Sequence, residues 1–382
     1  MSVKKSFEEI NDKITKGEAV VLTAEEVSQM GRSHSAEEIA EKVDVVTTAT
    51  FGPMCSSGMF INVGHANPPI RMESATLNGV PVCTGVAAVD LYIGATECHP
   101  DDPSYGGGHI IEDLIAGKDV ELIAHGKGTD CYPLKDIRTK INKNNINEMM
   151  MFNPRNAYQN YPVAVNCSNK IKYTYMGSLL PRMGNANYST SGELSPLLND
   201  PDMRTIGIGT RIFLGGTTGY VSWTGTQFKT EGQRNAHGIP EFNAATLSVI
   251  GDARRMSTDF IKAAYYEKYG VSIFIGIGIP LPVLDADMAK RLIIRNEQIT
   301  TRILDYGDPA HPELGKANYA ELMSGEISLN GKKIKTSSMS SMYKARIIAD
   351  QLKKQIEKGE FTLTKPLEPF PTNTTLNSLE IR

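Results

Sequence analysis

Hydrophobic residues at the start of the chain recur at helical spacing. Phe7, Ile10 and Ile14 fall on one face of a helix, because residues three and four apart lie side by side on its surface. Two later segments, 23–26 and 35–38, each place a hydroxyl residue three positions before a glutamate. In such a capping box, the hydroxyl and the glutamate satisfy free amide groups of the first helical turn. We therefore expect helical segments to open the chain.

The pattern then changes to short apolar and β-branched runs. Residues 45–50, Val-Val-Thr-Thr-Ala-Thr, predict a buried strand that breaks at Gly52-Pro53. Gly or Pro borders or interrupts three further apolar runs, at 80–82, 86–93 and 120–124. This punctuation is typical of strands joined by loops. Residues 142–156 are rich in Asn and Met and predict an irregular segment or surface crossover, whereas 163–175 returns to a strand pattern.

The second half of the chain contains a glycine-dense centre at 206–220. Residues 271–279 predict another buried strand, which Pro280 should end because proline lacks the amide donor. Residues 341–358 predict a final amphipathic helix. Strands mixed with helical segments predict an α/β fold, with a mixed sheet, flanking helices and Gly-rich loops at the strand ends. A single domain over 1–368, with two lobes meeting at the cysteine loops, fits best, followed by an extended tail at 369–382.

Charge and composition narrow the function classes. The chain has 382 residues and is 40% hydrophobic, enough for a large core. Its 40 basic and 43 acidic residues nearly balance, which argues against nucleic acid as a partner. No apolar run reaches membrane-spanning length, and the N-terminus lacks a signal-peptide pattern, so we expect no membrane association and a cytoplasmic protein. The cysteines are odd in number and far apart, which argues against a disulfide scaffold: Cys55, Cys83, Cys98, Cys131 and Cys167.

Cys55 lies in the segment 51–60, Phe-Gly-Pro-Met-Cys-Ser-Ser-Gly-Met-Phe, directly after the predicted strand. Small side chains in this turn leave backbone amides free to face a ligand. A thiol at the end of a strand, surrounded by donors, can be held as the reactive thiolate. The local sequence is also compatible with a buried structural cysteine, which is the commoner fate of a lone cysteine.

Cys131 has a similar setting. It follows an apolar strand in the glycine-bearing loop 126–133, Gly-Lys-Gly-Thr-Asp-Cys-Tyr-Pro. His125 and Lys127 would lower the pKa of the Cys131 thiol by their positive charge, and Asp130 would oppose them. Two such cysteines could meet at one sheet edge and exchange sulfur, provided that their sulfur atoms approach to bonding distance.

Other polar groups allow more than one interpretation. Cys98 to Asp102, with His109 close behind, mixes soft and hard ligands, but the spacing matches no regular zinc pattern and we expect no metal. The loop 105–109, Tyr-Gly-Gly-Gly-His, is interpreted as a mobile lid or an anion nest. Gly207 and Gly209 could present amides to a carboxylate or phosphate, or could serve only tight turns and close strand packing. The glycine spacing matches neither the dinucleotide fingerprint nor the P-loop.

The Cys55 block, continued to His65, together with the Cys131 block and the segment 276–282, resembles the homocysteine-biosynthesis family of anaerobes. Members of that family are similar to L-aspartate semialdehyde sulfurtransferase. The resemblance spans about Phe7 to Glu368, so it implies that 1–368 is one sulfur-incorporation domain. Some relatives carry paired nucleotide-sensing modules after this core, whereas this chain ends at Arg382 and is not expected to be regulated through them.

The resemblance implies a sulfurtransferase. Cys55 would carry a persulfide, sulfur would pass to the aldehyde carbon of L-aspartate semialdehyde, and Cys131 would act as the resolving thiol, with His125 as a further catalytic candidate. The substrate carboxylate needs a guanidinium or amides, and candidates beside Gly or Pro turns are Arg71, Arg182 and Arg211, with Gly207 and Gly209.

No bound cofactor is expected, but the reaction needs an external sulfide or persulfide donor and a reductant. The resemblance implies a small ferredoxin-like electron-donor protein as a partner, because this chain has no cluster-binding cysteine run. We also expect a homo-oligomer. Two alternatives remain open: a persulfide carrier without its own substrate pocket, and an α/β enzyme similar to CoA-transferases.

Overall fold

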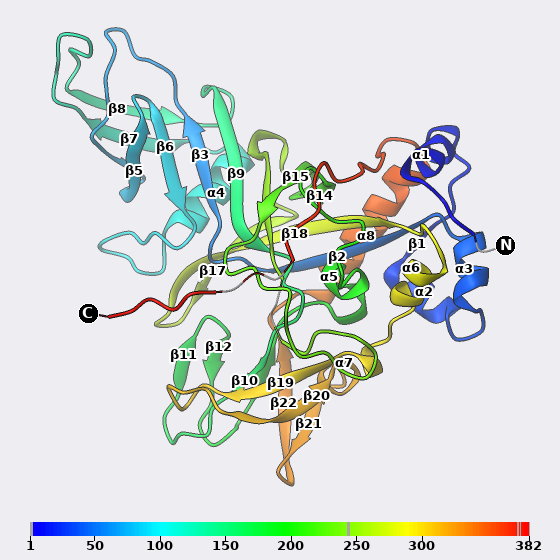
Figure 1. Ribbon diagram of the computed structural model, residues 1–382. Helices are drawn as coiled ribbons and strands as arrows, with labels where there is room; N and C mark the ends of the chain where they lie inside the picture. Colours follow the sequence, from blue (N-terminus) through cyan, green and yellow to red (C-terminus); the bar gives the residue numbers. More distant parts are fainter. Residues whose placement is uncertain (1–2, 243–244, 373, 375, 382) are drawn as a thin grey trace.

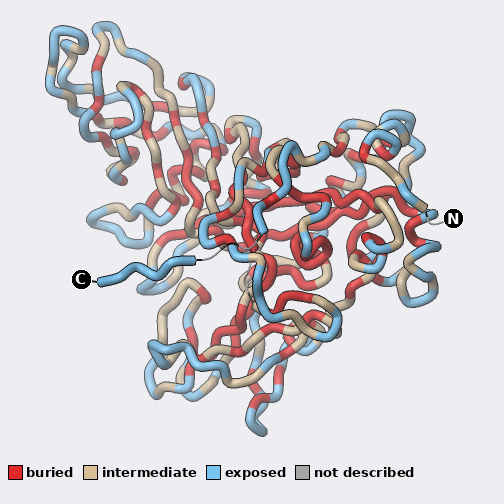
Figure 2. The backbone as a smooth tube through the Cα atoms, in the orientation of Figure 1, coloured by how far each residue is buried: buried red, intermediate tan, exposed pale blue. Residues whose placement is uncertain are grey.

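A computed structural model describes residues 3–242, 245–372, 374 and 376–381. Its larger lobe is built on a mixed 14-stranded sheet whose strands at 45–53, 211–214 and 270–282 are almost entirely buried (Figures 1 and 2). The strands are, in spatial order, β1 (Val21–Thr23), β2 (Val45–Pro53), β18 (Gly270–Pro282), β14 (Arg211–Leu214), β15 (Thr217–Thr224), β16 (Leu247–Asp252), β9 (Glu148–Asn156), β3 (Gly58–Asn62), β6 (Asp90–Gly94), β5 (Val80–Ala87), β4 (Ser74–Leu77), β7 (Val120–His125) and β8 (Asp136–Ile141), with β17 (Ile261–Tyr266) paired to β18.

A smaller lobe lies below the central strands in Figure 1 and has its own hydrophobic core. Its sheet contains, in order, β20 (Glu313–Asn318), β19 (Thr300–Asp305), β10 (Val163–Val165), β13 (Ala186–Tyr188), β22 (Lys332–Ser338) and β21 (Glu326–Leu329). A separate hairpin pairs β11 (Lys172–Thr174) with β12 (Gly177–Leu179). The fold is therefore α/β with mixed sheets, as expected from the sequence, and the chain passes between the two lobes several times.

Helices flank both lobes. They are α1 (Phe7–Lys16), α2 (Ala24–Met30), α3 (Ala36–Lys42), α4 (Gly107–Ala116), α5 (Pro196–Asn199), α6 (Ala286–Leu292), α7 (Tyr319–Met323) and α8 (Met342–Glu357), with short 3-10 turns at Gly192–Leu194, Ala253–Arg255 and Asn296–Gln298. The two predicted capping boxes are confirmed, since Thr23 and Ser35 accept from the amides of Glu26 and Glu38. The amphipathic face of the last helix is also confirmed, because the four apolar residues at helical spacing on it are fully buried.

Helix α8 lies across β2 and β18 and closes the core above them. Two glycines in β18 make this close approach possible. A Cβ atom at Gly276 would lie 2.7 Å from Ile348 Cδ1, and one at Gly278 would lie 3.0 Å from Ile348 Cγ2. Side chains larger than hydrogen at these positions would push the helix off the sheet.

Three predictions about strands were wrong. Residues 142–156 contain β9, a central strand rather than a surface crossover, because alternate methionines, Met149 and Met151, fill the core. Strand β2 continues through Gly52-Pro53, which pair with β18. Strand β18 continues through Pro280 and Pro282, because β14 pairs with it only as far as Gly278 and leaves that edge without a partner strand.

The segment after α8 runs back along the larger lobe. Glu368 forms a bridge with Ile208, and the Phe370 ring packs on Phe228 with 5.4 Å between centroids. Beyond it, the apolar side chains of Leu376, Leu379 and Ile381 are exposed. The described helices include none that is both long and apolar enough to cross a bilayer.

Candidate active site

Cys55 lies in the turn between β2 and β3. Pairing of Pro53 with Phe274 in β18 brings the turn against Ser272, whose hydroxyl lies 3.1 Å from the Cys55 sulfur. Two hydrogen bonds fix the turn, from the Met54 amide to the Ile273 carbonyl and from the Ser57 hydroxyl to the Met54 carbonyl. The half-buried thiol thus has a fully buried hydroxyl beside it that can donate to a sulfur anion.

A cavity of about 300 Å³ opens beside this thiol. Residues from both lobes line it: Pro53, Cys55, Ser56, Arg155, Tyr158, Tyr161, Tyr175, Met176, Ser189, Gln227, Tyr269 and Met339. The volume suits a small ligand, and the wall combines apolar rings with a few polar groups, as ligand sites commonly do. The prediction that two lobes meet at a cysteine loop therefore fits the Cys55 loop.

Tyrosines on β17 and the following turn surround the sulfur. Burial and the neighbouring Cys55 raise the pKa of Tyr269 to about 12. The same two causes raise the pKa of Tyr266, and burial also raises that of Tyr158. These phenols therefore remain protonated through the neutral range and can act as hydrogen-bond donors. The buried Tyr266 hydroxyl has no hydrogen-bond partner among the described residues.

A second set of phenols forms the wall from the smaller lobe. The Tyr161 hydroxyl donates to the Tyr175 hydroxyl at 3.0 Å, and Tyr175 lies 2.8 Å from the hydroxyl of Tyr306. Burial raises the pKa of both Tyr161 and Tyr306 above the usual tyrosine range. The connected hydroxyls hold the wall in one arrangement and keep it uncharged.

Arg155 supplies positive charge to the cavity. It follows the point where β9 leaves β3, and its Nε donates to the Thr226 hydroxyl at 2.9 Å. Within the described part of the chain, no carboxylate lies within ion-pair distance of Arg155, whereas many other arginines are paired. A guanidinium in a cavity without a protein counterion is suited to bind a substrate carboxylate.

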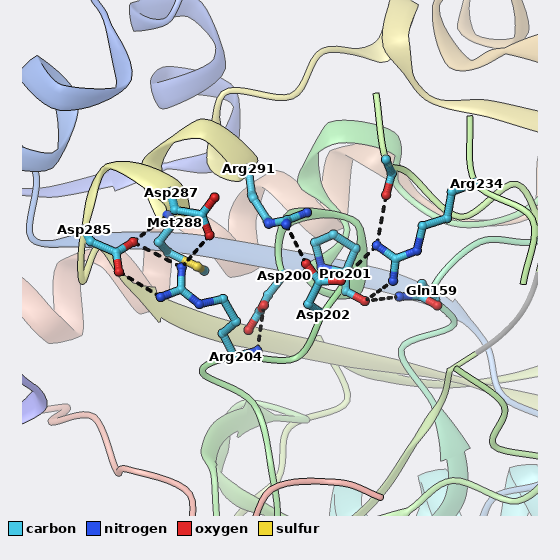
Figure 3. Close-up of polar contacts among 11 residues, drawn as sticks. Gln159, Asp200, Pro201, Asp202, Arg204, Arg234, Asp285, Asp287, Met288 and Arg291 are labelled. Carbon is cyan, nitrogen blue, oxygen red and sulfur yellow. Dashed lines mark hydrogen bonds and ion pairs between the residues drawn. The ribbon is translucent and has the colours of Figure 1, made fainter. Parts of the chain in front are cut away.

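A polar network connects the segment next to Tyr158 with α6 (Figure 3). Arg204 bridges Asp285 and Asp287 at the start of α6, and Arg234 and Arg291 both pair with Asp202. The buried Gln159, next to the cavity residue Tyr158, donates to the Pro201 carbonyl in the same network. This connection ties the segment carrying Tyr158 and Tyr161 to α6.

Cys131 does not line this cavity. It is exposed in the β7–β8 loop, on the part of the sheet at upper left in Figure 1. Cys55 precedes β3 whereas Cys131 follows β7, and the antiparallel order β3-β6-β5-β4-β7 places these points at opposite strand ends. Four strand spacings of about 4.8 Å separate them by ~19 Å across the sheet alone. A disulfide needs Cα atoms within ~7 Å, so one chain in this conformation does not bring the two thiols together.

The groups around Cys131 are paired with one another. His125 Nδ1 lies 2.6 Å from Asp136 Oδ1, and Lys127 pairs with Glu73 at 3.0 Å. All four side chains are largely exposed. His125 is thus far from the Cys55 cavity, and its role as a catalytic residue there has no support from position.

The three arginines proposed from the sequence lie elsewhere. Arg71 is exposed near Tyr132 in the Cys131 region, and Arg182 is exposed in a turn after β12. Arg211 stacks on the Phe361 ring at 4.4 Å, and its backbone amide donates to the Thr364 hydroxyl, so it fastens the C-terminal segment.

Gly207 and Gly209 also face the C-terminal segment. A Cβ atom on Gly207 would lie 2.5 Å from the Glu368 carbonyl oxygen, and Gly209 has a positive φ of 85°. Their amides donate to the Thr210 hydroxyl and the Val221 carbonyl. The structure therefore favours the close-packing interpretation of these glycines.

The two glycines that begin α4 have a packing role as well. Gly107 and Gly108 are buried, and their amides donate to the carbonyls of Glu97 and Ala95. A Cβ on Gly108 would lie 2.4 Å from the Ser272 carbonyl oxygen, so this loop lets α4 approach the strand that carries Ser272. The interpretation as a mobile lid or anion nest was wrong. In the described ranges, no three His, Cys, Asp or Glu side chains gather in a metal-binding arrangement.

Sequence reasoning missed Arg155, Ser272 and the cavity tyrosines. Arg155 stands in a segment interpreted as irregular, and Ser272 is 217 residues from Cys55. The one available signal was the unusual density of tyrosines at 158–175 and 265–269, next to predicted strands.

Comparisons with known proteins identify the family of the chain. The family model described as homocysteine biosynthesis enzyme, sulfur-incorporation, matches residues 19–363. The chain is 45% identical to the L-aspartate semialdehyde sulfurtransferase of Methanosarcina acetivorans, over 99% of this chain and 74% of that protein. It is 48% identical to the Methanocaldococcus jannaschii protein of the same name, over 96% of this chain and 73% of that protein. No solved structure matches. The chain therefore belongs to the family of sulfur-incorporating homocysteine biosynthesis enzymes.

Proposed function

We propose that this protein is a sulfurtransferase that incorporates sulfur into L-aspartate semialdehyde to form L-homocysteine, with Cys55 as the sulfur-carrying thiol. One observation carries the proposal: the cavity that Cys55 lines also contains Arg155, which pairs with no carboxylate in the described ranges. Two relatives that are 45% and 48% identical to this chain over nearly its whole length bear the name of this activity. The site thus offers a nucleophile and an anion-binding group within one small cavity.

Arg155 would bind the substrate carboxylate, and the aldehyde would then extend toward Cys55. A bidentate guanidinium contact fixes orientation as well as position. Tyr269, beside the thiol and with a pKa near 12, would donate its hydroxyl proton to the carbonyl oxygen as that oxygen gains charge. The Ser272 hydroxyl would stabilise the sulfur anion before attack.

The chemistry starts from a persulfide on Cys55. Its terminal sulfur anion attacks the aldehyde carbon, a C–S bond forms, and the carbonyl electron pair moves to oxygen, which takes a proton. Two electrons and one proton then cleave the S–S bond, leaving a Cys55 thiolate and a carbon that bears both hydroxyl and thiol groups. Loss of water gives a thioaldehyde, and two further electrons with two protons reduce it to homocysteine.

This sequence needs four electrons for each persulfide sulfur transferred, or two when sulfide itself is the donor. A low-potential external donor must supply them, and a small ferredoxin-like protein is the partner that we propose. The role of Cys131 as the resolving thiol stays a prediction. The present arrangement separates Cys131 from Cys55. Cys131 would therefore supply two of the electrons only if its loop moved or if a second copy of the chain brought its own Cys131 to the site.

The structure favours this proposal over the two alternatives. A persulfide carrier needs no substrate cavity, yet about 300 Å³ lies beside Cys55. An enzyme similar to CoA-transferases would use the glycine-rich centre for a phosphate, yet the amides of Gly207 and Gly209 already donate to the protein.

The test is reconstitution under anaerobic conditions with purified protein, isotopically labelled polysulfide as the persulfide donor, L-aspartate semialdehyde and a low-potential reductant. We expect labelled homocysteine by mass spectrometry, and in the absence of both semialdehyde and reductant we expect one extra labelled sulfur on the Cys55 peptide. Omitting the reductant should stop product formation but leave the persulfide in place.

Two outcomes would contradict the proposal. Release of labelled sulfide at the same rate with and without semialdehyde would indicate a carrier. Stabilisation against heat by CoA but not by semialdehyde would indicate the second alternative.

A further inference from the structure

Within the described residues, one face of the larger sheet has no covering α-helix across five neighbouring strands. From β15 through β16, β9 and β3 to β6, residues that pair directly across the strands share a face of the sheet. On one face the paired residues are fully buried, as Val249, Met151, Met59 and Ile93 show, and α4 packs against β3 and β6. The alternate residues face the other way.

Those alternate residues form two cross-strand rows, which we call the open face. The first row contains, in strand order, Tyr220, Ile250, Phe152, Gly58 and Gly94. The second row contains Asp252, Met150, Phe60, Tyr92 and Cys83, the last from β5. Tyr220 is 46% exposed and Met150 is 37% exposed. Trp223, after a bulge in β15, is 61% exposed.

An exposed apolar face of this kind usually marks an interaction surface. The width of the open face with β5 included is five strand spacings of about 4.8 Å, or ~24 Å. An interface that buries ~800 Å² on each partner is ~28 Å across if it is square. The first row carries no charge, and the second carries one charged residue, Asp252, which matches an interface with a charge-depleted centre and a polar rim.

The shape of the open face is complementary to itself. Tyr220 projects at one end of the first row, and Gly94 lies at the other end, where an added Cβ would meet no atom within 4 Å. Phe152 stands midway, with two strand spacings to each side. A twofold axis through Phe152 would place Tyr220 of each copy over the hollow at Gly94 of the other.

We propose that the open face binds a second copy of this chain, in a twofold-symmetric dimer with Phe152 near the axis and Tyr220 seated over Gly94. Such an isologous contact uses the same patch on both copies. It is possible here because the first row carries both a projection and a hollow, so the projection of each copy fits the hollow of the other. Face-to-face sheet packing at about 10 Å is a common arrangement for half-buried sheets. The dimer would also brace β9, which ends at Asn156 just beyond Arg155.

The test measures the mass of the full-length protein by light scattering over a dilution series. The single tryptophan, Trp223, gives an independent signal, since its emission should shift to shorter wavelength when the dimer covers it. Two variants target the contact: Tyr220→Glu removes the projection and Gly94→Leu fills the hollow. Both positions are open in the monomer, so far-UV circular dichroism should not change. Tyr343→Glu, an exposed tyrosine on α8, is the matched control.

We expect a dimer for the unmodified protein and for Tyr343→Glu, and at least about 30-fold weaker association with red-shifted emission for both open-face variants. A monomer at every concentration would overturn the proposal, and so would a dimer that neither variant weakens. Emission that shifts only when a separate electron-donor protein is added would assign the open face to that protein instead.

Discussion

The Cys55 and Cys131 loops share a local pattern but have different surroundings. Each cysteine follows a strand in a segment of small residues. The Cys55 turn lies between the lobes, beside a buried hydroxyl, a cavity and an unpaired guanidinium, judged within the described residues. The Cys131 loop is exposed, and the charged groups near it pair with one another. A cysteine that follows a strand in a glycine-bearing loop is therefore a candidate nucleophile. Residues distant in sequence decide whether a substrate cavity surrounds that cysteine.

The largest expected difference between the two loops is in turnover. Cys55→Ser should lower homocysteine formation at least about 1,000-fold, because the hydroxyl cannot carry a persulfide. Cys131→Ser should still accept sulfur on Cys55. Anaerobic product analysis and mass spectrometry of cysteine peptides measure both effects.

Alkylation of the native protein sharpens the same comparison. Cys131 should react faster than Cys55, and the two should change independently on exposure to air, since one chain keeps them apart. Simultaneous protection of both thiols would mean that the loops meet in a conformation or assembly different from this one.

The scaffolds under the two loops should differ in stability. Asp44 lies directly before β2, is buried, and pairs with both Lys5 and Lys13. Asp44→Asn should lower the free energy of unfolding by about 3 kcal/mol, because it leaves buried charge without a partner. Asp136→Asn, beside the Cys131 loop and largely exposed, should change it by less than about 0.5 kcal/mol. Urea unfolding measures both values.

The pH dependence of stability gives a second readout for Asp44. Burial alone would raise the pKa of Asp44, but hydrogen bonds from Lys13, the Val20 amide and Lys5 hold it below its ordinary value. The folded pKa is therefore depressed, so this stabilisation is present above the unfolded pKa and is lost as pH falls toward the folded one. Between about pH 5 and pH 2, Asp44→Asn should lose less stability than the unmodified protein. Parallel curves would contradict this assignment.

Replacement of the cavity arginine should mainly affect substrate binding. Arg155→Met should raise the KM for the semialdehyde about 50-fold, as expected when a carboxylate loses its charged partner. Arg71→Met, near the Cys131 loop, is the matched control and should leave the KM unchanged. An equal effect of both substitutions on the KM would contradict the assignment of Arg155 as the residue that binds the substrate carboxylate.

The smallest effect expected is that of the proton donor. Tyr269→Phe should reduce kcat about 10-fold without a comparable change in KM. Tyr265→Phe, on β17 outside the cavity lining, should be close to neutral. The pKa of Tyr269 is about 12, so its phenolate absorbance should appear near pH 12 in a titration of the unmodified protein. The variant Tyr269→Phe should therefore lose absorbance near pH 12 and keep the absorbance that appears near pH 10. Loss of absorbance near pH 10 would contradict the shift.

Local signals predicted local structure well. The β-branched run before Cys55, the capping boxes and the apolar face of α8 each report on contacts within a few residues. Strand β9 was missed because its core residues are methionine and asparagine rather than β-branched residues, and Asn153 and Asn156 are buried there. The prolines of β18 were misleading because a free strand edge cannot be seen from sequence.

The site was predictable only as far as its nucleophile. Cys55 is marked by its own neighbours, whereas Ser272 and Arg155 reach it through pairing of β2 with β18 and of β3 with β9. Arg71 and Arg211 had equally suggestive neighbours, and the fold uses them elsewhere. The sequence thus showed which residue types could serve the site. Which of them lie near Cys55 could be known only from the order of strands in the sheet.

The pairing of β2 with β18 also sets when the thiol becomes sheltered during synthesis. Ser272 follows Cys55 by 217 residues, and α8, which covers both strands, is later still. At ribosomal rates of about 5–20 residues per second, the cysteine waits ~10–40 s before its neighbouring strand has been made. During that interval the thiol is open to any electrophile or oxidant in the cell, without the cavity that later selects what reaches it. The newly made chain is then the form most sensitive to oxygen, and damage at that stage would remove activity before folding is complete.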